Sequence, residues 1–144
     1  MTTPTSSSLQ QFFRTYAAYA ASARVPEVVA HFADTFLAGG PQGARCVRSA
    51  DFALALPKRY EMFEKWGCRS TELLSVTELE LDSRYVLART KWRMAFAHGD
   101  AGGVDVEADS DFVIDTGTEP WKIIFYLANQ DLVEVLKKRG IAPE

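Results

Sequence analysis

The sequence predicts an α+β fold in which a curved antiparallel sheet wraps around helices from the N-terminal part of the chain. Helix-like patterns come first and strand-like patterns follow, which differs from the strict alternation that builds a parallel sheet. Residues 84–115 also alternate between apolar and polar side chains along two consecutive arms, as strands with one buried face do. The early helices are the only available cover for the apolar face, so we expect a cone with the helices inside.

The two arms within 84–115 predict a long hairpin with one apolar and one charged face. The apolar face carries Val86, Ala88, Thr90, Trp92, Met94, Phe96, Val106, Ala108, Ser110, Phe112 and Ile114. On the charged face, a turn at 98–103 brings Arg93 opposite Glu107, Lys91 opposite Asp109 and Arg89 opposite Asp111. Each such cross-strand pair contributes roughly 0.2–1 kcal/mol. A shift of one residue would turn every apolar side chain to the charged face, so the alternation sets the register.

The first elements are predicted from caps and apolar spacing. Residues 1–8 are small and polar and are expected to form a disordered tail before a single domain over 9–144. A helix is expected to start at Ser8, where capping-box spacing precedes apolar and aromatic residues that recur every three or four positions. Pro26 is suited to open a short second helix that carries Phe32.

The middle of the chain is punctuated by glycine and proline. Gly39-Gly40-Pro41 predicts a turn, and a short strand is expected at 44–47. A third helix is expected over 50–66, with its regular part starting near Pro57, because proline fits a first turn better than a helix interior. Gly67 is expected to end it.

The remaining strands follow the third helix. A strand over 71–82 and a tight turn at 82–85 would place Glu78 across from Arg89, which extends the charged face. The chain then closes with a strand over 121–128 and a short amphipathic helix over 130–139 that ends at Gly140.

Composition limits the classes of function. The chain has 144 residues, 47% of them hydrophobic, which suits one globular domain with its own core. A net charge of −3 provides no cationic field, so neither nucleic acid nor a membrane surface is an expected partner. No long apolar run and no leader-like segment is present, and a cytoplasmic location is expected. Cys46, Cys68, His31 and His98 lack metal-ligand spacing, and no metal or cofactor is expected.

The order of elements carries a family resemblance. Tyr16 in the first helix, followed by His31-Phe32-Ala33-Asp34 ahead of a Gly-Pro turn, resembles the nuclear transport factor 2-like superfamily, with its SnoaL-like proteins and ketosteroid isomerases. The resemblance extends from Leu9 to Asn129. It implies a cystatin-like cone: a curved sheet around helices, with an interior pocket used for isomerisation, cyclisation, dehydration, epoxide hydrolysis or binding alone. Because one fold hosts several activities, the resemblance does not define a reaction.

Ketosteroid isomerase offers the sharpest comparison, because its chemistry needs a carboxylate base and two hydrogen-bond donors for an enolate oxygen. Counting from the shared Phe-Ala-Asp motif, the tyrosine of the oxyanion hole falls on Tyr16. The position of the base falls on Gly40, and the third position falls on or beside Ser110 and Asp111, of which Ser110 should point inward. A glycine accepts no proton and a serine is no acid, so steroid isomerase activity is not expected.

The residues expected to matter for function lie on the helices and on the apolar face of the sheet. The catalytic candidates are Tyr16, His31 and Asp34, and the expected ligand-pocket residues are Tyr16, Tyr19, Phe32, Tyr60, Phe63, Trp66, Thr90, Trp92 and Ser110. For each there is a structural alternative: aromatic residues at helical spacing form cores, and an aspartate after a short helix often binds nearby backbone.

Two hypotheses follow. The first is a SnoaL-like domain, noncatalytic or accessory, that binds a small apolar molecule in the cone or only a partner chain. The second is an isomerase, cyclase or dehydratase acting on a small hydrophobic substrate, with Asp34 or His31 as base and Tyr16 as donor.

A homodimer through the outer sheet face is also expected. The family resemblance implies it, and the balanced charges on that face could meet a two-fold copy with unlike charges opposed. Residues 123–126 are apolar on both strand faces, so the outward pair needs cover from the C-terminal helix or from a second subunit.

Overall fold

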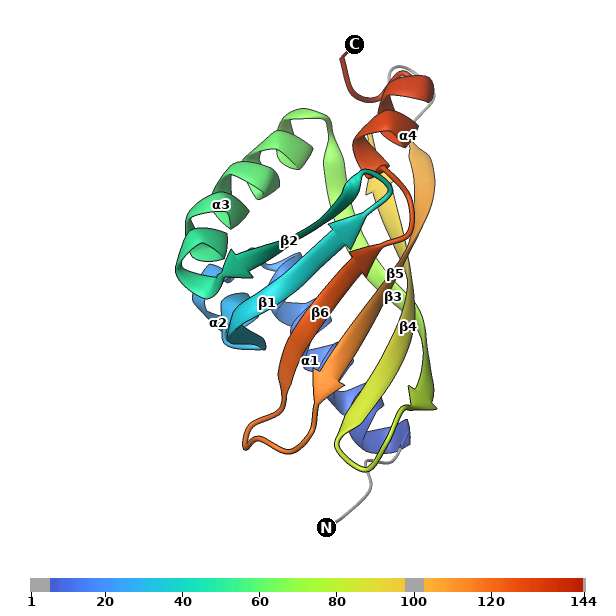
Figure 1. The fold of residues 1–144 in the computed structure, drawn as a ribbon. Helices are drawn as coiled ribbons and strands as arrows, with labels where there is room; N and C mark the ends of the chain where they lie inside the picture. The colour runs from blue at the N-terminus through green and yellow to red at the C-terminus, as the bar shows by residue number, and fades with distance from the viewer. Residues whose placement is uncertain (1–5, 98–102, 144) are drawn as a thin grey trace.

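The computed structural model describes residues 6–97 and 103–143, and its architecture is a curved, open sheet with helices on one side (Figure 1). In chain order the elements are α1 (Ser6–Ala21), α2 (Val25–Val29), β1 (Phe32–Gly40), β2 (Gly43–Arg48), α3 (Ser49–Lys65), β3 (Cys68–Glu80), β4 (Tyr85–Phe96), β5 (Val104–Asp115), β6 (Lys122–Ala128) and α4 (Leu132–Lys138). Figure 1 is viewed from the outer face of the sheet, and α1 crosses behind it. The α+β cone predicted from the sequence is therefore confirmed.

Within residues 6–97 and 103–143, the sheet has six strands in the order β2-β1-β6-β5-β4-β3. All neighbouring strands are antiparallel except β1 and β6, which are parallel, so the sheet is mixed rather than wholly antiparallel as expected. The difference comes from β1, a strand placed where the sequence predicted part of a helix and then a turn. Its last residues are glycines, which are weak strand formers, and pairing with β2 and β6 holds them extended.

The register of the β4–β5 hairpin is the predicted one. Arg89 lies opposite Asp111, Lys91 opposite Asp109 and Arg93 opposite Glu107. On the other face Val86, Ala88, Thr90, Trp92, Met94 and Phe96 are all buried. Most of the predicted turn, residues 98–102 with His98, lies outside the described residues.

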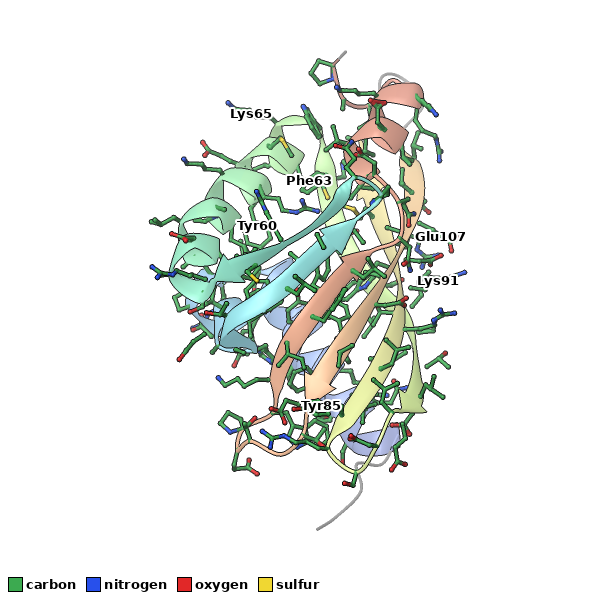
Figure 2. All side chains as sticks on the ribbon, in the orientation of Figure 1. Tyr60, Phe63, Lys65, Tyr85, Lys91 and Glu107 are labelled. Carbon is green, nitrogen blue, oxygen red and sulfur yellow. The ribbon has the colours of Figure 1, made fainter. Side chains whose placement is uncertain are left out.

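Only one of the three predicted cross-strand ion pairs on this hairpin joins residues that lie directly opposite each other. Arg89 contacts Asp111 directly across the ladder at 3.7 Å. Lys91 instead reaches the diagonal Glu107 at 4.0 Å (Figure 2), and Arg93 turns to Glu72 on β3 at 2.5 Å. Long side chains at the strand surface reach diagonal neighbours as easily as direct ones, so register alone did not determine the partners.

The predicted facing of Glu78 is wrong. Thr77, not Glu78, lies opposite Arg89, and Glu78 lies opposite Ala88 in the row of inward-facing residues. The register of β3 shifts between Leu73 and Ser75, and one extra residue in a strand reverses the facing of everything after it. The same bulge separates Leu73, which faces inward, from Leu79, which lies on the outer face.

The helices differ from the predictions mainly at their ends. α1 already includes Ser6, ahead of the expected start at Ser8. α3 runs from Ser49 to Lys65 with Pro57 in its interior, so the expectation that regular helix begins near Pro57 is wrong. Pro57 is exposed, so water can bind the carbonyl that loses its helical N–H partner.

In the part of the chain that the structure describes, the core consists of two clusters. The larger one joins α1, α2 and the start of α3 to the sheet, with Leu9, Phe13, Val28, Phe32, Phe36, Leu56, Val86, Ala88, Phe112, Ile114 and Ile123 buried. The second lies under α4 and the end of α3, with Phe63, Met94, Phe96, Val106, Leu136, Ile141 and Ala142. α4 therefore covers the inner face at one end of the cone and not the outer face of β6.

The outer face of the sheet carries one continuous apolar row, which we call the outer row. It consists of Leu79, Leu87, Val113, Phe125, Leu37 and Cys46, each directly opposite the next, and it crosses every strand. Leu79 and Cys46 at its two ends are exposed, and the other four are half-buried. A register shift in β5–β6 places Phe125 in this row and turns Tyr126 inward, opposite Phe112.

Candidate functional site

Tyr16 lies at the centre of the aromatic residues that line the concave face. Its ring packs edge-on against Trp92 at 6.1 Å and Phe112 at 5.9 Å between ring centroids, and it contacts Phe32 at 6.0 Å. Burial raises the pKa of the Tyr16 phenol far above its ordinary value, so the hydroxyl stays protonated and can donate a hydrogen bond at any physiological pH. The side chain is nevertheless only half-buried by its surface area.

Two further phenols and a guanidinium act electrostatically on the Tyr16 phenol. The phenols of Tyr126 and Tyr60 add to the increase in the pKa of Tyr16, and Arg59 opposes it. Burial also raises the pKa of Tyr60. Figure 2 shows Tyr60 projecting from α3 toward the sheet. Helix α1, helix α3 and strand β6 thus each direct a polar aromatic side chain toward the same interior region.

A hydrogen-bonded chain crosses the floor of this region. The Trp92 indole N–H donates to Thr90 Oγ1 over 2.7 Å. Thr90 Oγ1 lies 2.8 Å from the Ser110 carbonyl oxygen, which can only accept, and 2.9 Å from Ser110 Oγ. Thr90 therefore donates its proton to the carbonyl and accepts one from the Ser110 hydroxyl. Ser110 faces inward as predicted, but its proton is already used within the protein.

The predicted pocket residues divide into groups. Tyr16, Tyr60, Thr90, Trp92 and Ser110 surround the centre of the concave face. Phe32 packs into the larger cluster against Phe36 and Phe52, whereas Phe63 and Trp66 contact each other in the second cluster. Tyr19 contacts His31 and lies under the guanidinium of Arg24, away from the centre.

Tyr126 and Arg59 are residues that the sequence analysis did not select. Tyr126 was missed because the register shift in β6 made its facing impossible to read from alternation. Arg59 precedes Tyr60 on α3 and its guanidinium lies over the Phe63 ring at 4.9 Å. The available signal for it was a charged residue directly before Tyr60 and four positions before Phe63, a spacing that places it beside Phe63 on a helix.

His31 lies beside a different cavity, at the start of β1. Its Nδ1 is 2.8 Å from the Glu27 carbonyl oxygen, so Nδ1 carries a proton and Nε2 is left as the acceptor of the neutral ring. Burial lowers the pKa of His31, which favours that neutral form. The cleft has a volume of about 380 Å³ and is lined by Ser8, Gln11, Phe12, Thr15, His31, Glu119 and Trp121.

The remaining ketosteroid isomerase positions do not place an acid or a base on the concave side of the sheet. Asp34 is exposed on β1, and it does not share the enclosed setting of Tyr16. Gly40 ends β1 with no side chain to accept a proton. Asp111 is buried on the outer face, where Arg89 pairs with it at 3.7 Å.

Metal and membrane features can be assessed within the described residues. No group of three or more histidine, cysteine, aspartate or glutamate side chains is positioned there to hold a metal ion. In residues 6–97 and 103–143, no helix is long and apolar enough to cross a membrane.

Comparison with known proteins identifies structural relatives but no sequence relatives. No protein-family model matches the chain, and no curated protein matches it. A protein of unknown function from Shewanella oneidensis, described as NTF-2 like, superposes with a TM-score of 0.67 at 10% identity, covering 85% of this chain and 96% of that one.

Two other structures give similar agreement. A protein of unknown function with a cystatin-like fold from Nostoc punctiforme has a TM-score of 0.66 at 12% identity and covers 90% of this chain and 96% of that one. The beta subunit of benzoate 1,2-dioxygenase from Burkholderia mallei has a TM-score of 0.70 at 12% identity, with 92% and 94% covered. At this level of identity the likeness shows a shared fold, and it carries no information about activity.

Proposed function

Given the nuclear transport factor 2-like fold of this chain, we propose that the concave interior binds a small, mostly apolar molecule that carries at least one hydrogen-bonding group. The proposed binding space is the middle of the concave face, beside Trp92 and Tyr16. Sites of this kind are concave, lined by aromatic and aliphatic side chains, and supplied with few polar groups.

One observation carries the proposal: among the described residues, Trp92, in the middle of the concave face, is buried without joining either core cluster, and beside it Tyr16 only borders the larger one. Tyr16 is desolvated strongly enough to raise its pKa and still keeps accessible surface. A side chain that is desolvated and still keeps accessible surface is suited to contact a ligand, and this supports the proposal.

The polar group of the ligand should bind the phenols and not the floor of the site. The protons of Thr90, Ser110 and Trp92 are all used within their own chain of hydrogen bonds. The hydroxyls of Tyr16 and Tyr60 take part in none of these hydrogen bonds, so they are the proposed donors. A carbonyl, hydroxyl or carboxylate oxygen on an otherwise apolar ligand fits this set.

The test is a titration with anilinonaphthalene sulfonate, a planar apolar dye with an anionic group, followed by quenching of tryptophan fluorescence. We expect quenching in the native protein that is much smaller in Trp92→Phe, because Trp92 borders the space. Tyr16→Phe should weaken binding by about fivefold or more, which corresponds to a lost hydrogen bond of roughly 1 kcal/mol.

Tyr19→Phe is the matched control. It removes the same atom from the same helix, but Tyr19 contacts His31 and Arg24 and not the centre of the site. Its affinity for the dye should equal that of the native protein. If the folded protein binds neither this dye nor any member of a panel of lipophilic compounds, the interior is a filled core and the proposal is wrong.

An enzymatic alternative is favoured by the tautomer of His31. With the Nδ1 proton held by the Glu27 carbonyl, Nε2 is available as a base at neutral pH. In this alternative His31, rather than the exposed Asp34, removes a proton from a small hydrophobic substrate and Tyr16, whose ring lies 5.5 Å from the imidazole, donates a hydrogen bond. Proton–deuterium exchange into a panel of ketones, lost in His31→Gln and kept in Asp34→Asn, would support it.

We also propose that two copies associate through the outer face of the sheet. The outer row presents a continuous apolar strip, and rows of opposite charge lie beside it, with Arg89 pairing to Asp111 and Lys91 to Glu107. A strip flanked by both signs of charge can meet its own two-fold copy without net repulsion. Because α4 packs on the inner face, it leaves the outer side of Phe125 to another subunit.

Sedimentation equilibrium at micromolar concentration tests this association. We expect twice the 16.0 kDa mass of one chain for the native protein and a single-chain mass for Phe125→Glu. The matched control is Leu54→Glu, because Leu54 is 73% exposed on α3 and lies outside the outer row. A native protein that sediments as 16.0 kDa at all concentrations would contradict the proposal.

A further inference from the structure

Strand β3 is an edge of the sheet, and its free side opens into a groove. It spans Cys68–Glu80 and pairs with β4 on one side only. α1 runs along β3, and between them lies a groove of about 620 Å³. A strand of this length with an unpaired edge presents a row of backbone N–H and C=O groups that can bind another extended chain.

The two walls of the groove have different chemistry. The helix wall consists of Gln10, Arg14, Ala17, Ala18 and Ala21, and the strand wall is the continuous stretch Ser70–Ser75. The small side chains of the alanines leave space between the helix and the strand edge. Leu74 lies at the bulge in β3. Its large apolar side chain is 36% exposed and forms part of the strand wall.

At one end of the groove, a side chain of α1 already binds the backbone edge of β3. The Gln10 side-chain amide donates to the Val76 carbonyl oxygen over 3.1 Å. A side chain of α1 thus satisfies a backbone acceptor of β3 by supplying an N–H donor, which is what the backbone of a further strand would supply. Gln10 closes the groove at this end, and residues 70–75 remain beyond it.

The charges of the groove favour an acidic partner. Arg14 is exposed, and none of the described carboxylates pairs with it. Glu72 on the strand wall is held by Arg93 at 2.5 Å. The unpaired charge of the groove is therefore positive.

We propose that an extended acidic peptide segment of a partner protein adds to β3 as a further strand along Ser70–Ser75. The pairing covers about 20 Å of strand, with an acidic side chain bound to Arg14 and an apolar side chain placed against Leu74 and the alanines. Backbone pairing supplies affinity in this mode of recognition and the side-chain contacts supply specificity. A second copy of this chain fits less well, because Glu72, the acidic residue in its own 70–75 stretch, is already paired.

The test is selection from a displayed library of random eight-residue peptides, followed by fluorescence anisotropy of the enriched peptides with the purified protein. We expect enriched peptides to carry an acidic residue within an alternating apolar sequence. Ala18→Trp, which fills the groove, should weaken their binding at least tenfold, and Arg14→Glu should do the same. Ala55→Trp, a matched change at an exposed alanine on α3, should leave binding unchanged.

Two measurements separate strand addition from other forms of binding. Methylating alternate backbone nitrogens of an enriched peptide should abolish binding, and hydrogen exchange should show new protection of backbone amides within 70–75. Peptides that bind Ala18→Trp as tightly as the native protein, or a library that yields no enrichment, would overturn the proposal. The proposal would also be overturned if the native protein were a dimer and Ala18→Trp dissociated it, because a second copy of the chain would then occupy the groove. The groove shares no lining residue with the proposed interior site, so binding of the dye to the interior is independent of each of these results.

Discussion

Replacing Thr90 with valine tests the hydrogen-bonded floor of the interior. Valine has nearly the same shape as threonine, so the change removes one hydroxyl and leaves almost no cavity. The Trp92 indole N–H, now 2.7 Å from Thr90 Oγ1, would lose its acceptor inside a buried environment. A buried donor without a partner costs about 1–3 kcal/mol.

We therefore expect Thr90→Val to lower the free energy of unfolding by about 2 kcal/mol, which corresponds to a melting temperature lower by about 4–8 °C for a domain of this size. In the Trp92→Phe background the indole donor no longer exists, so the same substitution breaks only the two contacts with Ser110 and should cost about 1 kcal/mol less. The double-mutant cycle should thus give a coupling energy of about 1 kcal/mol or more.

Urea unfolding followed by far-UV circular dichroism is suitable, because its signal does not depend on the tryptophan that is replaced. Thr77→Val is the control, since Thr77 is an exposed threonine on the outer face of β3, and it should change stability by no more than about 0.5 kcal/mol. A Thr90→Val protein as stable as the native one, or additive effects in the cycle, would refute the hydrogen-bond assignment.

Three further predictions concern charge, protonation and backbone conformation. Arg84 holds Asp115 with two contacts of 2.7 and 2.9 Å and lowers the pKa of Asp115; that pair's stabilisation should be present above about pH 4 and lost as pH falls through the lowered pKa. Asp115→Asn should accordingly flatten the acid limb of stability measured by urea midpoints. Burial lowers the pKa of His31, so below about pH 6.5 the unfolded chain binds more protons than the folded protein. The free energy of unfolding should therefore decrease as pH falls from about 6.5 to the pKa of His31 in the folded protein. His31→Gln should remove this slope, and an NMR titration of the imidazole checks the direction of the pKa shift. Gly67 has a φ of +94°, and an added Cβ would lie 2.6 Å from the backbone oxygen of Ala97, the residue after β4, so Gly67→Ala should cost about 2 kcal/mol or more. Its control Gly40→Ala meets nothing closer than 3.9 Å and should be far milder, and equal thermal shifts for the two variants would contradict the assignment of strain.

The hairpin was predictable because alternation has a direct physical cause. In a regular ladder each residue faces opposite to its neighbour, so the order of apolar and charged residues in β4 and β5 specified both faces and the register. Tyr16 and Trp92 were placed in the interior by the same type of reasoning from helical and strand periodicity. These predictions required only local spacing along the chain.

Beyond a β-bulge, alternation no longer predicted which face a side chain lies on. The shift at Leu74 turned Glu78 to the inward side, and the shift in β5–β6 turned Tyr126 inward and Phe125 outward. A bulge is a property of two paired strands, so it does not show in the alternation of one strand. β1 was missed for a related reason, since its glycines are held in a strand by pairing with neighbours distant in sequence.

For the interior site, the sequence determined which residues share the concave side, and the tertiary structure determined their partners. Residue type and spacing by themselves determined that Tyr16, Trp92, Thr90 and Ser110 share the concave side. Only the tertiary structure decided that the Ser110 proton is used internally and that Tyr126 joins Tyr16. Facing along one element is a local property set by backbone geometry, whereas hydrogen-bond partners are chosen among side chains that meet only when separate elements pack together.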